Sequence, residues 1–394
     1  MIFNANQRIR FPIPTKELER RWSAVRSAMI EQGIDLLVMQ NDNQFLGGYV
    51  RYFLDVPAEQ AYPITVLFPA GEEMTVISCG APSGSLPPDY ALRGVKAKIG
   101  RPYFRSVSYT NQLDAEVAVK TIRDLKCKKV GFVGFSMLSA MFYKYLTENL
   151  AEVEFVDATD MVDRIKAIKS EEEIAWIRKA VAMHDYVVAA IPALLRPGMY
   201  EFELRAELQK IMVEYGSEEQ LIMMGSEVTG KRTPQLHSFL QNRRIEKGDQ
   251  VFVMVEASGP AGFYAEIGRI FSLDDPPRPL LEAWEIARSA QHYVASLLKP
   301  GAEPARLLEA NNSFLEGKGF AGEERLFAHG QGYDLVERPA FLPQETMKLE
   351  ENMLVAVHPV AANDSVFAFC CDNYLVTAEG AELLQKTPQE IFVL

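Results

Sequence analysis

Three histidines in the C-terminal half of this chain stand in segments where their side chains could do chemistry. They are His237, His329 and His358, out of five histidines in 394 residues. A histidine near its ordinary pKa can accept and return a proton around neutral pH. His329 lies in the segment Ala328-His-Gly-Gln-Gly332, whose two glycines indicate a close approach of backbone. These three histidines are our candidate catalytic residues.

Two glutamates are candidate acids for the same site. An alternating pattern over residues 263–273 predicts a strand that presents Tyr264 and Glu266 on one face, and Arg269 on the other. A buried carboxylate needs a partner, so Glu256 or Glu266 could simply form a structural ion pair with Arg269. A cleft carboxylate could instead bind a cation, orient a histidine or attack as a nucleophile. We rank Glu266 first as a catalytic residue, with Glu256 and Tyr264 as substrate-binding residues.

An internal repeat would bring residues from two copies to one cleft. LLRPGMYEFELRAELQKIMVEYG begins at Leu194, and LLKPGAEPARLLEANNSFLEGKG begins at Leu297. Each copy has the pattern of a Pro-Gly turn followed by an amphipathic helix with a glycine at its end. Sequence rich in β-formers follows each copy, at 250–273 and 353–377. The duplication predicts two αβ halves related by a pseudo-twofold axis.

The first part of the chain alternates helical and strand patterns. The predicted helices cover 15–32, 113–125 and 137–149, and the predicted strands cover 34–39, 64–68, 74–78 and 130–135. Ser170 and Glu173 then have the spacing of a capping box, which begins a helix of the second part. We therefore predict an α/β domain over 1–162 and an α+β domain with the internal repeat over 163–394.

Composition excludes several classes of protein. The formal net charge is −12 and the isoelectric point is near 5.1, which disfavours nucleic acid as a partner. The sequence has no apolar run long enough to cross a membrane and no signal-peptide pattern at Met1. Four cysteines without a C-x-x-C pair are typical of a reduced, cytoplasmic protein. A small-molecule substrate is the expected partner.

Several segments resemble the creatinase, aminopeptidase P and prolidase family, which has the pita-bread fold. Asp163 to Ala180 resembles its domain-entry motif, and His237 followed by Gly248-Asp249 resembles its cleft histidine and the turn before a central strand. Residues 262–269 resemble its Gly-Tyr-x-x-Asp-x-x-Arg motif, and residues 328–332 resemble its Gly-His-Gly-x-Gly motif. Residues 353–360 and 371–377 resemble the last two strands that carry site residues in the family. The resemblance covers nearly the whole chain and implies the fold.

The resemblance also implies five positions at which metallopeptidases of the family hold two metal ions. Those positions normally carry two Asp, one His and two Glu, whose carboxylates can bridge a pair of cations. The first falls on Met254 or Val255, depending on the placement of one insertion. The other four are Glu266, His329, His358 and Cys371, so one of five keeps its usual residue. A dinuclear, carboxylate-bridged site is therefore not expected.

We expect a creatinase-like hydrolase that cleaves a C–N bond of a small polar nitrogenous substrate without a metal cofactor. His237 would be the general base, as the matching histidine is understood to be in creatinase. Cys371 and Arg51 would contact substrate, and Arg51 stands where the N-terminal domain of a dimer partner often reaches the cleft in this branch. The family branch itself implies a homodimer. One alternative is a mononuclear Zn or Fe hydrolase, or an Xaa-Pro peptidase-like enzyme, with Glu266, His329, His358 and Cys371 as metal ligands. Another is a catalytically inactive small-molecule binding protein.

Overall fold

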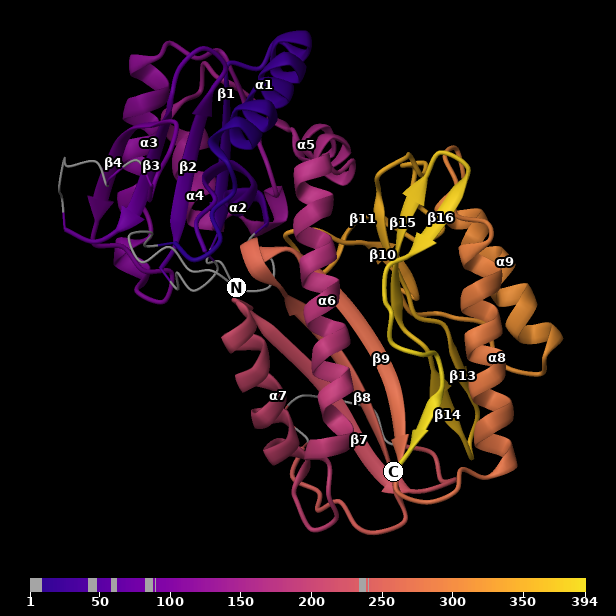
Figure 1. Cartoon of the computed structure of the whole chain (residues 1–394). Coiled ribbons are helices and arrows are strands. Elements are labelled where there is room, and N and C mark those ends of the chain that lie inside the picture. Colours follow the sequence, from indigo (N-terminus) through magenta and orange to yellow (C-terminus); the bar gives the residue numbers. More distant parts are fainter. Residues whose placement is uncertain are drawn as a thin grey trace. The chain divides into compact units, whose positions relative to one another are not determined.

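The computed structural model describes residues 9–41, 48–57, 62–81, 88, 90–233, 239 and 241–394. The chain divides into two compact units, Met1–Lys166 and Ala167–Leu394. Figure 1 traces both units along the sequence. His237 lies outside the described residues. Within the described part of the chain, no helix has the length and apolar character that crossing a membrane requires.

The N-terminal unit is an α/β fold built on one mixed sheet. The strand order is β4 (Val95–Arg101), β3 (Met74–Cys79), β2 (Ile64–Pro69), β1 (Leu36–Asn41), β5 (Lys129–Phe132), β6 (Glu154–Asp157). Five α-helices are described with it: α1 (Thr15–Gln32), α2 (Gly48–Leu54), α3 (Leu113–Asp124), α4 (Ala140–Asn149) and α5 (Thr159–Ala167). Short 3-10 helices lie at Ser108–Thr110 and Phe135–Met137. The predicted α/β character is confirmed.

The first half of the C-terminal unit is a sheet covered by two helices. Its strands are ordered β17 (Ile391–Val393), β9 (Tyr264–Ser272), β8 (Asp249–Ser258), β7 (Gln220–Val228). Helices α6 (Glu171–Leu194) and α7 (Glu201–Tyr215) lie along it in Figure 1, and their apolar side chains pack on its inner-facing valines and isoleucines. The predicted capping box begins α6, with Ser170 Oγ accepting from the backbone N–H of Glu173.

The second half repeats this plan with a second sheet and helix pair. The sheet is ordered β11 (Glu337–Ala340), β10 (Ala328–Gly330), β12 (Leu354–Val357), β15 (Asp372–Thr377), β16 (Gly380–Leu383), and β13 (Val360–Ala362) pairs with β14 (Phe367–Phe369). Helices α8 (Arg278–Ala295) and α9 (Pro304–Gly317) flank it (Figure 1). A one-turn 3-10 helix, Pro260–Gly262, connects β8 to β9 in the first half.

The predicted repeat is visible in the helices themselves. Helices α7 and α9 begin 103 residues apart, at Glu201 and Pro304. The matched turn glycines Gly198 and Gly301 have φ of 94° and 85°. The second matched pair also has positive φ: Gly216 caps α7, and Gly319 follows the last residue of α9 by two positions. Glycine adopts this backbone conformation without the cost that a Cβ would impose. The two halves therefore share turn chemistry as well as apolar spacing.

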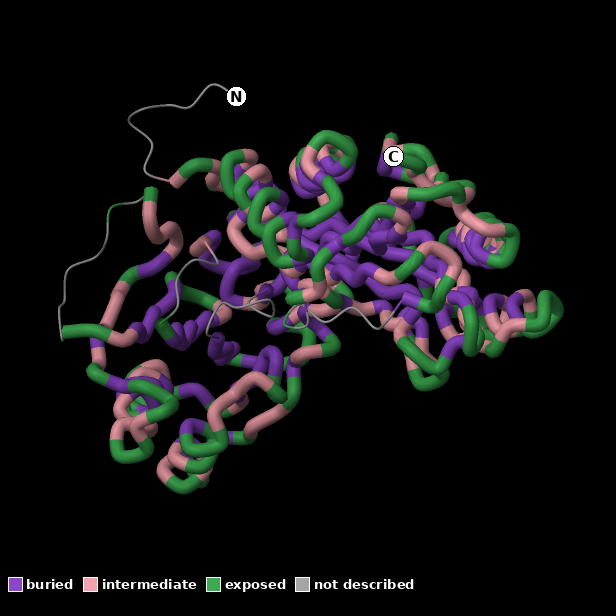
Figure 2. The backbone as a smooth tube through the Cα atoms, turned by 90° about the horizontal axis from the view of Figure 1, so that it is seen from below, coloured by how far each residue is buried: buried purple, intermediate pink, exposed green. Residues whose placement is uncertain are grey.

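The two sheets of the C-terminal unit meet where β9 approaches the start of β15. The backbone N–H of Gly268 donates to the carbonyl of Cys371 at 3.1 Å, an isolated antiparallel bridge. A Cβ at position 268 would lie 2.2 Å from Cζ of Phe369, so the approach requires glycine. Every residue of β8 and β9 is buried, and Figure 2 shows buried strands inside helices whose outer faces are exposed. Side chains from both halves thus converge in a buried interior.

Candidate metal centre

Three of the predicted catalytic side chains meet at the junction of the two sheets. Nε2 of His358 lies 3.6 Å from Oε1 of Glu266, and Nε2 of His329 lies 3.8 Å from the same oxygen. The two imidazole rings are 5.3 Å apart between centroids. All three side chains are buried. Each offers one ligand atom, and these atoms lie within 4.8 Å of one another.

Strand alternation explains why these side chains share one face. On the second sheet, His329 is paired with Ala356, and Ala356 is paired with Asn373. His358 and Cys371 each lie two residues from a member of that row, so they point to the same side. Glu266 reaches this face from the first sheet, because its backbone N–H donates to Oδ1 of Asn373 at 2.8 Å.

Hydrogen bonds orient the His329 ring toward the centre of the group. Its Nδ1 is 2.9 Å from the carbonyl oxygen of Gly330. A carbonyl oxygen can only accept, so Nδ1 carries the proton and Nε2 keeps its lone pair. The nitrogen that faces Glu266 is therefore the one able to bind a metal.

The Glu266 carboxyl group is held on both oxygens. Nε2 of Gln331 donates to Oε2 at 3.2 Å, and the Cys371 thiol donates to Oε1 at 3.3 Å. Gln331 is itself held by Asn373, whose Nδ2 donates to its side-chain oxygen at 2.7 Å. Gln385 completes this set by donating to the Glu266 carbonyl at 2.9 Å. Sequence reasoning missed Gln331, Asn373 and Gln385, although Gln331 stands inside the glycine-rich segment already singled out.

A second carboxyl group lies directly opposite Glu266. The antiparallel register of β8 and β9 pairs Glu256 with Glu266 and places both on the same face of the sheet. Met254, two residues earlier, is on that face opposite Gly268, whereas Val255 packs among the apolar residues under α6 and α7. Met254 and Val255 therefore bring no ligand to the site, and Glu256 is the acid of β8 that faces it.

Burial controls the charge of every titratable group here. It raises the pKa of Glu256 to about 7, and burial together with the charge of Glu256 raises the pKa of Glu266 well above its ordinary value. Burial lowers the pKa of His329 to about 4, and burial and the neighbouring His329 hold the pKa of His358 well below its usual range. Burial likewise raises the pKa of the Cys371 thiol. Both histidines are thus neutral, which is the state that binds metal.

The remaining predicted site residues have other surroundings. Tyr264 is on the Glu266 face of β9, and its hydroxyl donates to Oε2 of Glu219 at 2.5 Å. Arg51 lies in the N-terminal unit, where it is buried and 3.4 Å from Oδ1 of Asp55. The roles proposed for Tyr264 and Arg51 toward substrate stay predictions.

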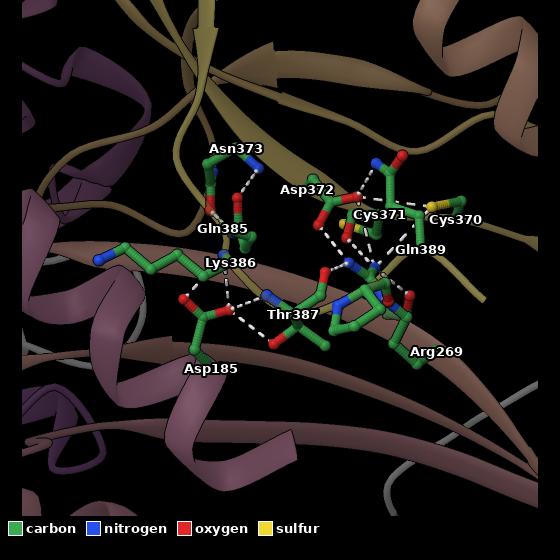
Figure 3. Close-up of polar contacts among 12 residues, drawn as sticks. Asp185, Arg269, Cys370, Cys371, Asp372, Asn373, Gln385, Lys386, Thr387 and Gln389 are labelled. Atoms are coloured by element: carbon green, nitrogen blue, oxygen red, sulfur yellow. Dashed lines mark hydrogen bonds and ion pairs between the residues drawn. The ribbon is translucent and has the colours of Figure 1, made fainter. Parts of the chain in front are cut away.

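The alternative partner considered for the two acids, Arg269, is engaged elsewhere. Its Nη2 lies 2.7 Å from Oδ1 of Asp372, and both side chains are fully buried. Figure 3 shows this pair with Gln389, which also donates to Asp372, beside the Cys370–Cys371 segment. Arg269 additionally donates to the carbonyl of Cys371 at 3.0 Å. The pair therefore fixes the strand start that carries Cys371 and leaves Glu256 and Glu266 free of Arg269.

Comparison with known proteins identifies the family. A model described as metallopeptidase family M24 matches residues 175–378, more than half of the chain. The chain belongs to metallopeptidase family M24. M24 membership confirms the resemblance seen in the sequence, and with it the pita-bread fold and a hydrolase that acts on C–N bonds.

Several named relatives can be aligned with almost the whole length of this M24 chain. A Sinorhizobium fredii protein called uncharacterized hydrolase/peptidase y4tL is 27% identical over 97% of this chain and 97% of its own length. The ectoine hydrolase of Halomonas elongata is 23% identical over 98% of this chain and 99% of its own. The X-Pro aminopeptidase structure from Thermotoga maritima is similar with a TM-score of 0.79 at 20% identity, covering 95% of this chain and 99% of that one.

The expectation of a site without a metal cofactor is wrong. The family is one of metallopeptidases, and Glu266, His329 and His358 together present a buried ligand set. Two histidines and one carboxylate are the ligands of known catalytic zinc sites, which keep an open position for water or substrate. Ligand atoms around one tetrahedral zinc ion lie about 3.4 Å apart at the usual bond lengths. The spacings of 3.6 and 3.8 Å at Glu266 are close to that value, and all three ligand atoms lie within 4.8 Å of one another.

Proposed function

We propose that this M24 hydrolase cleaves the amide or amidine C–N bond of a small substrate at a single metal ion, Zn or Fe, held by Glu266, His329 and His358. The observation that carries the proposal is the convergence of one carboxylate and two imidazole Nε2 atoms from both halves of the unit. The same ligand types with open positions occur in catalytic zinc and non-haem iron sites. When bound, the cation would supply Lewis-acid polarisation of the scissile group and of the attacking water.

Glu256 has the properties of the group that moves protons. It is buried directly opposite Glu266, and among the described residues no hydrogen bond to its carboxyl group is found. A buried carboxylate that no side chain holds can take a proton from water and return it to a leaving amine. Cys371 and Gln331 have a different part, because their hydrogen bonds hold Glu266 in place.

Metal content and activity test the proposal together. Protein purified without chelator or added metal should contain about one transition-metal ion per chain. Chelation should abolish hydrolysis of a panel of small amides, cyclic amidines and Xaa-Pro dipeptides, and Zn²⁺ or Fe²⁺ should restore it. His358→Ala should lose both metal and activity, whereas His292→Ala, on α8 outside the site, should keep both. Full metal content in His329→Ala and His358→Ala would overturn the ligand assignment.

Two further expectations stay predictions. The resemblance to the creatinase and aminopeptidase P branch predicts a homodimer, which sedimentation of the purified chain would test. The cysteine pattern predicts a cytoplasmic protein, which fractionation of cells would test.

A further inference from the structure

An aromatic pocket adjoins the candidate metal centre. Its volume is about 370 Å³, at the small end of ligand-binding cavities. Phe252, Phe367 and Phe369 form one wall, with ring centroids of Phe252 and Phe369 4.2 Å apart. Met223 and Met254, paired across β7 and β8, also line the pocket, and Met254 lies two residues after Phe252 on the same strand. Such a lining suits a flat or branched apolar group.

The walls of this pocket come from strands β7, β8, β13 and β14, and β8 is paired with β9, the strand that carries Glu266. Met254 is paired with Gly268 across β8 and β9, two residues beyond Glu266, and the Phe369 ring packs against Gly268. Val360, the first residue of β13, lines the pocket two residues after His358. A small molecule in the pocket would therefore lie beside the ligand set.

The charged side chains that line the pocket are both arginines. They are Arg232 and Arg325, and no acidic residue is among the described lining residues. Two cations at one small pocket contrast with the net charge of −12 for the whole chain. An anion at the pocket would be attracted to them.

Arg325 is held in position with hydrogen-bonding capacity to spare. Its Nε and Nη2 donate to the two oxygens of Glu323 at 3.0 and 2.8 Å. Glu323 is buried and also accepts from the backbone N–H of Val360 at 2.9 Å, which ties Arg325 to the pocket wall. In the described part of the chain, Nη1 of Arg325 and the exposed Arg232 guanidinium donate no hydrogen bond. These groups are available to a carboxylate, which a guanidinium binds well.

We propose that the pocket binds substrates that combine an apolar side chain with a carboxylate, in the manner of an N-acyl amino acid. The phenylalanine wall receives the apolar side chain, and Arg232 and Nη1 of Arg325 receive the carboxylate. The bond to be cleaved then lies toward Glu266, His329 and His358. This assignment of substrate class rests on the proposed function, because it places the pocket at the hydrolytic site.

Calorimetric titration of three ligands tests the proposal. N-acetylphenylalanine is anionic and aromatic, its carboxamide is neutral and of the same shape, and N-acetylglycine is anionic without a ring. The first should bind about tenfold or more tightly than either of the others. Equal affinities for the acid and the carboxamide would overturn the proposal.

Substitutions in the pocket test which side chains contribute to the affinity for these ligands. Arg232→Gln should weaken N-acetylphenylalanine about tenfold and leave the carboxamide unchanged. Phe367→Trp should weaken both by filling the pocket. Arg288→Gln, at a partly exposed arginine on α8 outside the pocket, is the matched control and should change neither. Unchanged affinity in both Arg232→Gln and Phe367→Trp would exclude this pocket.

Repeating the titrations in EDTA separates this proposal from the hydrolytic one. Retained, carboxylate-dependent binding in a protein that never hydrolyses an amide would support the pocket and overturn the proposed function. Metal-dependent hydrolysis with equal KM for acids and their carboxamides would support the function and overturn the pocket.

Discussion

Glu256 and Glu266 face one another across neighbouring antiparallel strands, both buried in the C-terminal unit. Two buried carboxyl groups this close do not both ionise without a compensating positive charge. A cation bound by Glu266 and the two histidines would supply such a charge and would make Glu266 the ligand. Under the proposed function, Glu256 would then be the acid that exchanges protons.

Replacing Glu256 with glutamine tests this division of roles. Glu256→Gln keeps the shape of the side chain and removes its ability to accept a proton. We expect kcat to fall by about 100-fold or more, while metal content stays at the level of the unmodified protein. Glu207→Gln, an exposed acid on α7, should change neither quantity. Loss of the metal from Glu256→Gln would make Glu256 a ligand instead.

Gln331 should act on metal affinity through the orientation of Glu266. Gln331→Leu removes the hydrogen bond to Oε2 of Glu266, and loss of such an outer hydrogen bond commonly weakens metal binding by about 10- to 100-fold. Competition with a chromogenic chelator would measure the change. Gln220→Leu, a partly buried glutamine on β7, provides a comparison whose metal affinity should not move. A fully retained affinity in Gln331→Leu would show that Cys371 alone suffices to hold the carboxylate.

The Arg269–Asp372 pair should contribute to stability far more than an exposed pair. Asp372→Asn leaves the fully buried Arg269 guanidinium without a counter-charge, which typically costs about 3–5 kcal/mol of folding free energy. Glu382→Gln breaks the Arg178–Glu382 pair, which is nearly half exposed, and should cost under about 1 kcal/mol. Urea unfolding of both variants would provide the comparison. Equal losses would mean that solvent reaches Arg269.

The lowered pKa of His184 predicts that the folded protein loses stability in acid. Burial lowers the pKa of this helix α6 histidine to about 4, although Asp185 acts in the opposite direction. The unfolded chain takes up a proton near pH 6.5 that the folded protein resists until about pH 4, so stability is full above pH 6.5 and falls as the pH is lowered.

The variant His184→Leu removes this titration. The free energy of unfolding should therefore fall less between pH 7 and pH 4.5 in the variant, by about 3 kcal/mol at most. Met183→Leu, at the neighbouring buried position, should keep the original pH dependence. Parallel pH profiles for His184→Leu and the unmodified protein would contradict the assignment.

Short sequence patterns predicted the structural features that depend only on residues near one another in the chain. The capping box at Ser170, the alternation around Glu266 and the repeated glycine turns all follow from short-range stereochemistry. These features, with the family resemblance, predicted the fold and brought Glu266, His329 and His358 together as candidates.

The sequence could not predict contacts between residues that are far apart along the chain. Asp372 partners Arg269 across 103 positions, and Asn373 reaches Glu266 across 107. No local periodicity encodes such contacts. The prediction of a site without a metal was wrong because it compared each ligand position with the family's usual residue. A cation binds to whichever suitable donor atoms converge in space.

One hydrogen bond at the seam between the two sheets joins main chain to main chain. Gly268 donates its backbone N–H to the Cys371 carbonyl, and the lack of a Cβ at Gly268 is what permits the approach. The Phe369 ring occupies the space that a Cβ at Gly268 would need, so this joint depends on the glycine and on that ring together. The donor atoms of Glu266, His329 and His358 lie outside the joint, so they can be exchanged while Gly268 and Phe369 keep the two sheets in place.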